Sequence, residues 1–157
     1  MDSLDRGILA ALQSEGRTSN LALAKQFNLS PSAMLGRVRK LEQAGAIQGY
    51  RAVVDPAALG VGVQAIVMAK LRGHDQEGIA AFELAVQEVP GVRACYHVTG
   101  QFDMVMLVAV RDLDHLARLI RVDLAKIPGV LQFETMLVLN ACVADDGWPV
   151  FQEDREE

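Results

Sequence analysis

The apolar positions near the N-terminus follow helical spacing and predict three short helices. In the first helix these positions are Leu4, Ile8, Leu9 and Leu12. This helix is expected to end at Gly16, after which the hydroxyl of Thr18 or Ser19 can cap a second helix. Ser30 followed by Pro31 marks the start of the third helix, because a capping hydroxyl then precedes a proline at the first helical position.

The third helix is expected to run to Ala44, because Gly45 is a favourable left-handed stop. Three short helices, the last two joined by a tight turn, have the spacing of a helix-turn-helix. Residues 46–55, AIQGYRAVVD, are interpreted as a short strand pair or wing. The sequence therefore predicts a winged helix-turn-helix domain over residues 1–54.

The remaining residues predict an α+β domain in which strands and helices alternate. Residues 55–62, DPAALGVG, have the proline and glycines of a hinge. Beyond this hinge, strands are expected at 63–71, 92–100, 103–110 and 131–139, and helices at 78–92 and 112–130. This order is βαββαβ, the ferredoxin-like arrangement. The second domain is accordingly assigned to residues 63–157.

The third helix has a core side and a side suited to DNA. Met34, Val38 and Leu41 form one apolar stripe and are expected to be buried. The opposite side holds Ser32, Ala33, Gly36, Arg39, Lys40 and Gln43, with Arg37 beside the core stripe and Ser30 at the start. Small residues allow a helix to approach a groove closely, and cations can contact phosphates. A solvated charged surface is the alternative, but the helix-turn-helix context favours double-stranded DNA as the partner.

The strand over residues 103–110 predicts self-association. Every residue from Met104 to Val110 is apolar, so both faces of this strand favour burial. Two helices can cover only one face of a four-stranded sheet. The other face therefore needs a partner, most simply the same sheet of a second copy, and we expect at least a homodimer.

Composition and charge agree with two modules that have different partners. The chain has 157 residues and a net charge of −5, yet residues 1–54 hold seven Lys and Arg against four Asp and Glu. No run approaches the roughly 18 apolar residues of a membrane helix, and the N-terminus has no signal-peptide layout. Cys95, Cys142 and the three histidines show no metal-ligand spacing. We therefore expect a cytoplasmic protein without a metal, cofactor or membrane partner.

Three segments resemble the Lrp/AsnC, or feast/famine, family of transcription regulators. They are LDRGILAALQSEGRTSNLALAKQFNLSPSAMLGRVRKLEQAGAIQGYRAVVDPAALG, VTGQFD and IPGV. The resemblance covers residues 1–150 and places the helix-turn-helix at about Leu21–Lys40. It implies an N-terminal DNA-binding domain and a C-terminal domain that senses ligand and oligomerises. It also implies dimers that assemble further, commonly to octamers, and a small effector, usually an amino acid, bound between dimers.

The resemblance also implies an effector site at the loop GQFD and the last strand. The loop residues are Gly100, Gln101 and Asp103, and the strand contributes Thr135. Gly100 permits close approach of a ligand to the backbone, while Asp103 could pair with an ammonium group. The alternative is a tight hairpin turn in which Gly100 supplies a positive φ and Asp103 only caps the turn.

Two departures from the family pattern keep other functions open. Relatives often carry a longer polar residue at Gly36 and an acidic residue at Gln101. The first departure allows a sensor or assembly subunit with weakened DNA binding. An enzyme is a further alternative, because some relatives of this fold decarboxylate a tetrapyrrole. That branch has His- and Arg-rich strands around its cleft, whereas His97 stands alone here.

Overall fold

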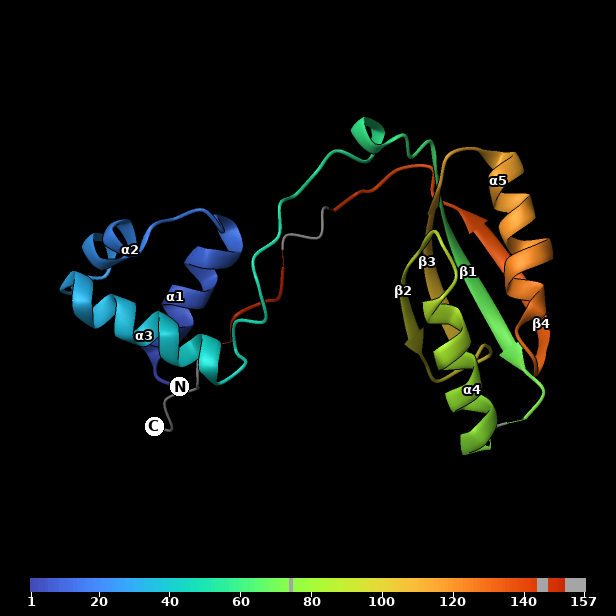
Figure 1. The fold of residues 1–157 in the computed structure, drawn as a ribbon, viewed down its shortest axis with the longest axis horizontal. Helices are drawn as coiled ribbons and strands as arrows, with labels where there is room; N and C mark the ends of the chain where they lie inside the picture. Colours follow the sequence, from blue (N-terminus) through green and yellow to red (C-terminus); the bar gives the residue numbers. More distant parts are fainter. Residues whose placement is uncertain (74, 144–146, 152–157) are drawn as a thin grey trace. The chain divides into compact units, whose positions relative to one another are not determined.

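The computed structural model describes residues 1–73, 75–143 and 147–151, and the chain divides into two compact units. The first unit combines residues 1–53 with the tail from Val143, and the second unit is Val54–Cys142. Figure 1 shows helices alone in the first unit and a sheet with helices in the second. In the described part of the tail, the Trp148 backbone forms two hydrogen bonds with the side chain of Gln13 in the first helix.

The three expected helices form the first unit. They are α1 (Ser3–Ser14), α2 (Asn20–Gln26) and α3 (Pro31–Gln43). The helix starts follow the predicted caps, because Ser19 accepts a hydrogen bond from the Ala22 backbone N–H and Ser30 from that of Ala33. Gly45 has a φ of +72°, as a left-handed stop requires. The helices enclose a core of Ile8, Leu23, Ala24, Met34, Val38 and Leu41.

The predicted strand pair at residues 46–55 is not formed. These residues leave α3 as irregular chain and reach a short 3-10 helix, Pro56–Leu59. The Ala46 and Ile47 backbone N–H groups donate to the Leu41 carbonyl at the end of α3, and the Asp55 carbonyl accepts from Ala58. No described strand pairs with residues 46–55, and a strand without a neighbour has no ladder to join. Gly60 then turns the chain into the second unit with a φ of +77°.

The second unit is the expected βαββαβ arrangement. Its elements are β1 (Val63–Leu71), α4 (Gln76–Gln87), β2 (Val92–His97), β3 (Met104–Val110), α5 (Leu113–Arg118) and β4 (Val130–Leu137). The strands form one antiparallel sheet in the order β2-β3-β1-β4. Helix α5 continues as a π-helical segment, Leu119–Asp123, and a 3-10 turn, Leu124–Lys126, where the sequence predicted one continuous helix.

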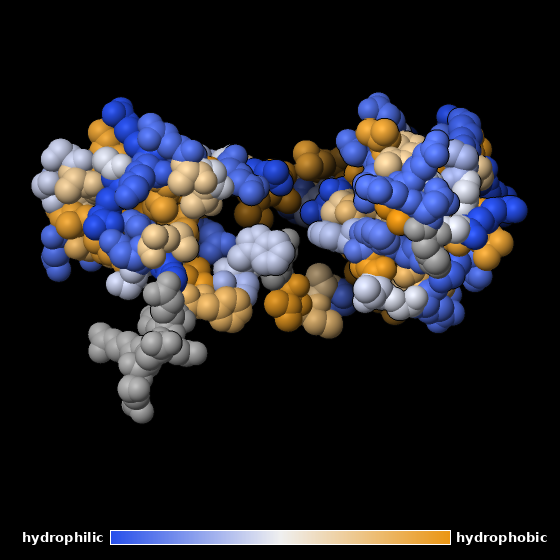
Figure 2. Space-filling view, turned by 90° about the horizontal axis from the view of Figure 1, so that it is seen from below, coloured by the Kyte–Doolittle hydropathy of each residue, from blue (hydrophilic) through white to orange (hydrophobic). Residues whose placement is uncertain are grey.

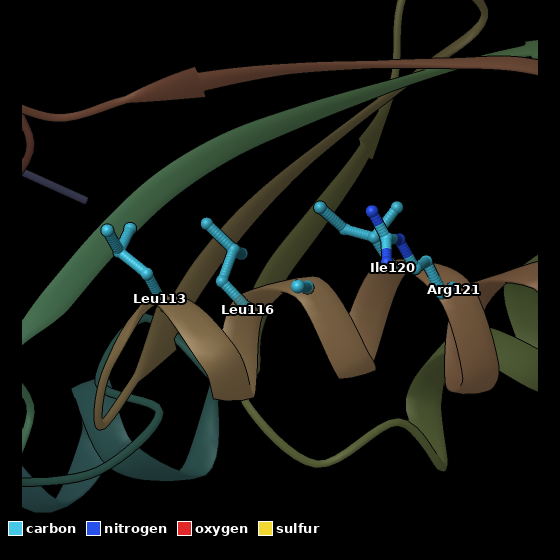
Figure 3. Close-up of a pocket in the computed structure, with 5 residues that line it drawn as sticks. Leu113, Leu116, Ile120 and Arg121 are labelled. Atoms are coloured by element: carbon cyan, nitrogen blue, oxygen red, sulfur yellow. The ribbon is translucent and has the colours of Figure 1, made fainter.

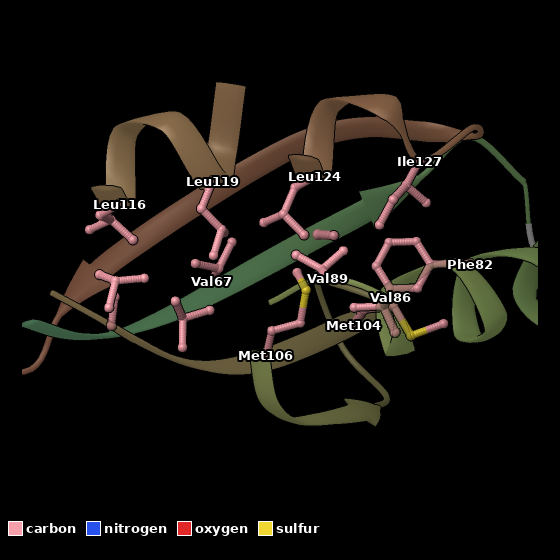
Figure 4. Close-up of a cluster of buried hydrophobic side chains, with 14 of the residues drawn as sticks. Val67, Phe82, Val86, Val89, Met104, Met106, Leu116, Leu119, Leu124 and Ile127 are labelled. Atoms are coloured by element: carbon pink, nitrogen blue, oxygen red, sulfur yellow. The ribbon is translucent and has the colours of Figure 1, made fainter. Parts of the chain in front are cut away.

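Both helices cover the same face of the sheet (Figure 1). Alternate strand residues point toward these helices and form the core together with helix side chains (Figure 4). The strands contribute Val67, Met104 and Met106, and the helical segments contribute Phe82, Leu116, Leu119 and Leu124. The intervening residues lie on the opposite face. There the strand register brings together Ile66, Met68, Ala94, Val105, Leu107, Ala109 and Met136. Within the described residues nothing covers this apolar face, so its side chains are only half-buried or remain exposed.

Candidate DNA interface and effector site

Helix α3 presents the two sides that the sequence predicted. Met34, Val38 and Leu41 are buried against α1 and α2. The opposite side is exposed and consists of Ser32, Ala33, Gly36, Arg39 and Lys40. A Cβ atom built on Gly36 would meet nothing within 4 Å, so the helix surface is open at its midpoint. This side can lie close to another molecule.

The serine hydroxyls at the start of α3 have different tasks. The Ser30 hydroxyl accepts the Ala33 backbone N–H at 3.2 Å and therefore serves the helix itself. It also lies 3.2 Å from the hydroxyl of Ser32, which is exposed. Ser30 thus fixes the first turn, and Ser32 projects from that turn toward solvent.

Arg37 has intramolecular partners that the sequence did not reveal. Its Nη1 donates to Asp2 Oδ2 at 2.8 Å and to Asp5 Oδ1 at 2.6 Å. Asp2 and Asp5 form the capping box of α1, so Arg37 joins the start of that helix to α3. The backbone N–H of Asp5 and the Arg37 guanidinium lower the pKa of Asp2. The expected phosphate contact of Arg37 would compete with these carboxylates.

Arg39 and Lys40 differ from Arg37, which forms ion pairs with Asp2 and Asp5. Both are exposed, and no ion pair involves either of them among the described residues. Their charges are therefore available to an external anion. Hydrophilic and hydrophobic residues are mixed over the face of the first unit that Figure 2 shows.

A shallow cavity of about 380 Å³ lies beside α3 in the first unit. It is lined by residues of α1, α2 and α3 and by Tyr50, which follows α3. The Tyr50 hydroxyl donates to Glu42 Oε1 at 3.0 Å. Burial raises the pKa of Tyr50, and Glu42 adds to this effect because a nearby anion disfavours phenolate. This contact ties the irregular segment back to α3.

The expected effector loop is the hairpin between β2 and β3. The Val98 backbone N–H donates to the Asp103 carbonyl at 2.9 Å and closes the hairpin. Gly100 has a φ of +124°, and a Cβ there would meet nothing within 4 Å, so its backbone is open to solvent. Gln101 is exposed. These two residues are thus accessible to a small ligand.

Asp103 is the one buried polar residue among those described, with 6% of its surface exposed. Its Oδ2 accepts the Leu71 backbone N–H at 2.7 Å, and its Oδ1 lies 3.7 Å from Lys70 Nζ. Its own backbone N–H donates to the carbonyl of Ala69 at 3.0 Å. These contacts do not support direct pairing with an ammonium group. They favour the structural alternative, in which Asp103 fastens the loop to the end of β1.

The structure does not bring Thr135 next to the loop within one chain. Thr135 is exposed on β4 and pairs with Val67 of β1, whereas Asp103 is level with the far end of β1. At the usual strand dimensions the two residues are on the order of 15 Å apart. A site that uses both would need a second copy of the chain, as the family resemblance implies.

The remaining cavity among the described residues shows no catalytic arrangement. A shallow cavity of about 250 Å³ on α5 is lined by Leu113, Leu116, Ala117, Ile120 and Arg121. Figure 3 shows Leu113, Leu116 and Ile120 pointing toward the sheet, and Arg121 is the one titratable side chain in the lining. Within the described ranges, no three His, Cys, Asp or Glu residues form a metal-binding group.

The fold and the open helix face define a DNA-binding protein with a separate ligand domain, and comparison with known proteins identifies its family. Residues 1–48 match a winged helix-turn-helix DNA-binding domain, and residues 64–148 match the Lrp/AsnC ligand binding domain. The chain is 36% identical to the leucine-responsive regulatory proteins of Escherichia coli K12 and Salmonella typhimurium over 140 residues, which cover 89% of this chain and 85% of each relative. The chain therefore belongs to the Lrp/AsnC family of transcription regulators.

Solved structures agree with this assignment. The structure of Escherichia coli AsnC has a TM-score of 0.82 and 32% identity, covering 92% of this chain and 95% of that one. A transcriptional regulator of Neisseria meningitidis in complex with L-Met has a TM-score of 0.86 and 28% identity, covering 92% and 93%. An AsnC family regulator from Agrobacterium tumefaciens reaches 0.88 at 28% identity, covering 95% and 97%.

Family membership decides between a transcription regulator and the enzyme that the sequence left open. The protein is a DNA-binding regulator with a ligand-binding domain, and not an enzyme of the tetrapyrrole-decarboxylating branch. Among the described residues, no helix combines the length and apolar character needed to span a membrane.

Proposed function

We propose that this regulator changes its DNA binding or its assembly in response to a free amino acid. The observation that carries this proposal is the match of residues 64–148 to the Lrp/AsnC ligand binding domain. The Neisseria meningitidis relative in complex with L-Met supports an amino acid as the class of ligand. Transcription takes place on chromosomal DNA, so the site of action would be the cytoplasm.

The proposed DNA contacts come from the exposed side of α3. Arg39 and Lys40 contact phosphates, because their charges have no partner within the described chain. Ser32, Ala33 and Gly36 face base edges, since their small side chains leave the helix surface open. Ser30 acts by capping the helix. Arg37 contributes chiefly by holding α1 against α3.

The proposed effector contacts come from the open part of the hairpin. Gly100 exposes its backbone, and Gln101 supplies an exposed amide that can donate and accept hydrogen bonds. Thr135 contributes a hydroxyl from a neighbouring copy. Asp103 positions this loop through Leu71 and Lys70 and is not the ammonium partner.

The proposed assembly starts from the uncovered face of the sheet. Leu107 lies on this face opposite Ile66, and Val105 opposite Met68, so a continuous apolar surface spans the central strands. A second copy of the same sheet is the simplest cover, which gives a homodimer. Further assembly, for example to an octamer, would bring Thr135 of one copy to the loop of another.

A thermal-shift screen of the twenty amino acids tests the effector class directly. A ligand that binds only the folded protein stabilises it by RT ln(1 + [L]/Kd), where [L] is the free ligand concentration. The Tm therefore rises as the ligand concentration exceeds the Kd. Calorimetry and a gel shift on the DNA upstream of the protein's own gene then show whether the same amino acid alters DNA binding. If no amino acid shifts the Tm at millimolar concentration, the effector is of another class.

A further inference from the structure

The side chain of Gln13 holds the backbone of the C-terminal tail. Gln13 is exposed in the last turn of α1, and its Nε2 donates to the carbonyl oxygen of Trp148 at 3.0 Å. The Trp148 backbone N–H in turn donates to Gln13 Oε1 at 2.7 Å. One side-chain amide therefore satisfies both polar backbone groups of one tail residue, as the neighbouring strand of a sheet would.

The backbone on either side of Trp148 suits this contact. Gly147 has a φ of +107°, and a Cβ atom there would lie 2.6 Å from Gln13 Oε1. Any other residue would be strained in this conformation and would displace the glutamine amide. Pro149 favours an extended backbone at Trp148, the conformation in which the N–H and C=O of one residue point to the same side. Residues 147–149 are therefore shaped for docking on α1.

The contact does not depend on the indole ring, because Trp148 remains 84% exposed. The tail is held by two exposed hydrogen bonds and by the geometry of its backbone. Each such bond contributes little, because water can replace it. The tail can therefore leave α1 while the helices stay folded. We call this docked segment, residues 147–149 on Gln13, the latch.

The latch gives the DNA-binding unit a second attachment to the second unit. The chain passes from the DNA-binding unit to the second unit after Val53 and returns after Cys142. The first connection enters the sheet at the start of β1, and the second connection leaves it at the end of β4. There the Val138 backbone N–H donates to the Gln64 carbonyl at 2.9 Å. Both connections therefore reach the second unit at neighbouring points of its sheet.

The two connections also attach to neighbouring parts of the DNA-binding unit. Tyr50, at the start of the first connection, donates to Glu42 of α3 and lines a cavity together with Leu12 of α1. Gln13, where the second connection docks, follows Leu12 directly. A unit held by one flexible connection can rotate about it. Two connections with neighbouring ends resist that rotation, because they would have to wind around each other.

We propose that the latch restricts rotation of the DNA-binding unit on the second unit and thereby strengthens binding to DNA that engages two such units. This inference rests on the proposed homodimer. A duplex that contacts both DNA-binding units fixes the orientation of each, and the freedom lost on binding lowers affinity. A unit that is already restricted loses less freedom, so a docked tail raises affinity without adding a contact to DNA.

Two variants of the full chain open the latch from opposite sides. Gln13→Ala removes the docking amide from α1 and introduces a residue that favours helix. Gly147→Ala disturbs the same contact from the tail and leaves α1 unchanged. Gln87→Ala is the matched control, because this exposed glutamine of α4 donates to the Glu83 carbonyl of its own helix.

Docking is measured by hydrogen exchange of the Trp148 amide. Both latch variants should exchange about fivefold to tenfold faster than the unmodified protein, which corresponds to the loss of one or two exposed hydrogen bonds. Gln87→Ala should match the unmodified protein. Unchanged exchange in Gln13→Ala would overturn the proposal, because this contact would then not hold the tail.

Rotation of the DNA-binding unit is measured as the width of the distance distribution between two spin labels. Gln26→Cys in α2 and Ala81→Cys in α4 provide exposed attachment sites, and Cys95→Ala with Cys142→Ser removes the natural thiols. Labelled chains are mixed with an excess of unlabelled chains, so that only distances within one chain are recorded. The latch variants should widen the distribution about twofold, because a single flexible connection samples many orientations. An unchanged width would contradict the restraint.

DNA affinity is then measured on a duplex that the unmodified protein selects from a random pool. Both latch variants should bind this duplex about threefold to tenfold more weakly, with an unchanged slope of log affinity against log salt, because no phosphate contact is lost. Equal affinity of the latch variants and the unmodified protein would overturn the proposal. Sedimentation of the unmodified protein tests the homodimer separately. A monomer would contradict the proposed assembly, while hydrogen exchange and the spin labels would still decide whether the latch restricts the unit.

Discussion

The carboxylate of Asp103 accepts a hydrogen bond of 2.7 Å from the backbone N–H of Leu71, a residue 32 positions earlier in the chain. This bond joins the β2–β3 hairpin to the last residue of β1, beyond Ala69 and Met104, the last pair of the β1–β3 ladder. A buried N–H beyond the end of that ladder needs an acceptor, and Asp103 supplies it. The residue that the family pattern marks for the effector therefore extends the contact between the hairpin and β1.

The first prediction follows from this bond. Asp103→Ala leaves the Leu71 N–H buried without an acceptor and should lower the free energy of unfolding by about 1–3 kcal/mol. Asp103→Asn keeps an acceptor oxygen and should cost less. Urea unfolding measures both, with Asp123→Ala as control because Asp123 forms a 3.8 Å pair with Lys126 at the surface. Equal stability of Asp103→Ala and the unmodified protein would contradict the structural role.

The same substitution decides the role of Asp103 toward the effector. A positioning role predicts that Asp103→Asn binds the amino acid found in the thermal-shift screen within a few-fold of the unmodified protein. A direct ammonium pair would instead lose roughly one to two decades of affinity, since hydrogen bonds to charged groups contribute about 1.5–3 kcal/mol. Calorimetry on the full-length protein distinguishes these results.

Local signals in the sequence were enough to predict most of the fold. Ser19 and Ser30 cap their helices, and β1 spans the predicted residues 63–71, because these features depend on neighbours within a few positions. The exposed side of α3 could likewise be predicted from its helical period. The strand pair at 46–55 was not formed, since a strand depends on a partner that local pattern cannot supply.

Contacts between residues far apart in the chain could not be predicted from the spacing of apolar and polar residues. Arg37 pairs with Asp2, 35 positions away in the chain. Its place on the third helix indicated only solvent or phosphate as the partner of its charge. The acidic capping box was the signal that could have revealed its partner. Gln13 meets Trp148 across 135 positions, and a lone exposed glutamine carries no such signal. Gly147 next to Trp148 hints at a tight backbone approach only once the structure is known.

The second prediction concerns salt and DNA. Lys40→Ala should weaken binding to every duplex and reduce the slope of log affinity against log salt by about 0.9, because one phosphate contact is lost. Lys126→Ala removes the same charge from an exposed position of the second unit and should leave the slope unchanged. Gel shifts over a salt series provide both slopes. An unaltered slope in Lys40→Ala would place this residue outside the interface.

The third prediction separates base recognition from affinity. Ser32 is exposed in the first turn of α3, and its small side chain allows close approach to base edges. Replacing it with alanine should change which sequences are selected from a random duplex pool while leaving the salt slope near that of the unmodified protein. Identical selected sequences for both proteins would assign readout to other residues of α3.

The fourth prediction concerns acid stability. The Asp5 backbone N–H and the Arg37 guanidinium lower the pKa of Asp2 from its ordinary 3.8 in the folded state. A lowered folded pKa contributes stability that is complete above the ordinary pKa and is lost as the pH falls through the folded pKa. Asp2→Asn still caps α1 but cannot titrate, so its Tm should fall less between about pH 5 and about pH 2.

The fifth prediction uses two neighbours on β3 that face opposite sides of the sheet. Val108 is 2% exposed and points into the core under the helices, whereas Leu107 lies on the uncovered face opposite Ile66. A buried unpaired carboxylate costs several kcal/mol even after relaxation. Val108→Asp should therefore prevent folding, whereas Leu107→Asp should leave a folded chain that no longer dimerises.

Sedimentation and circular dichroism at micromolar concentration distinguish these outcomes, and Gln64→Asp serves as a control because Gln64 is already polar at the margin of the same face. Loss of the dimer in Leu107→Asp with native helix content would place the interface on the open sheet. A folded monomer for the unmodified protein would contradict the proposed assembly, because the apolar face would then be stable in water without a second copy to cover it.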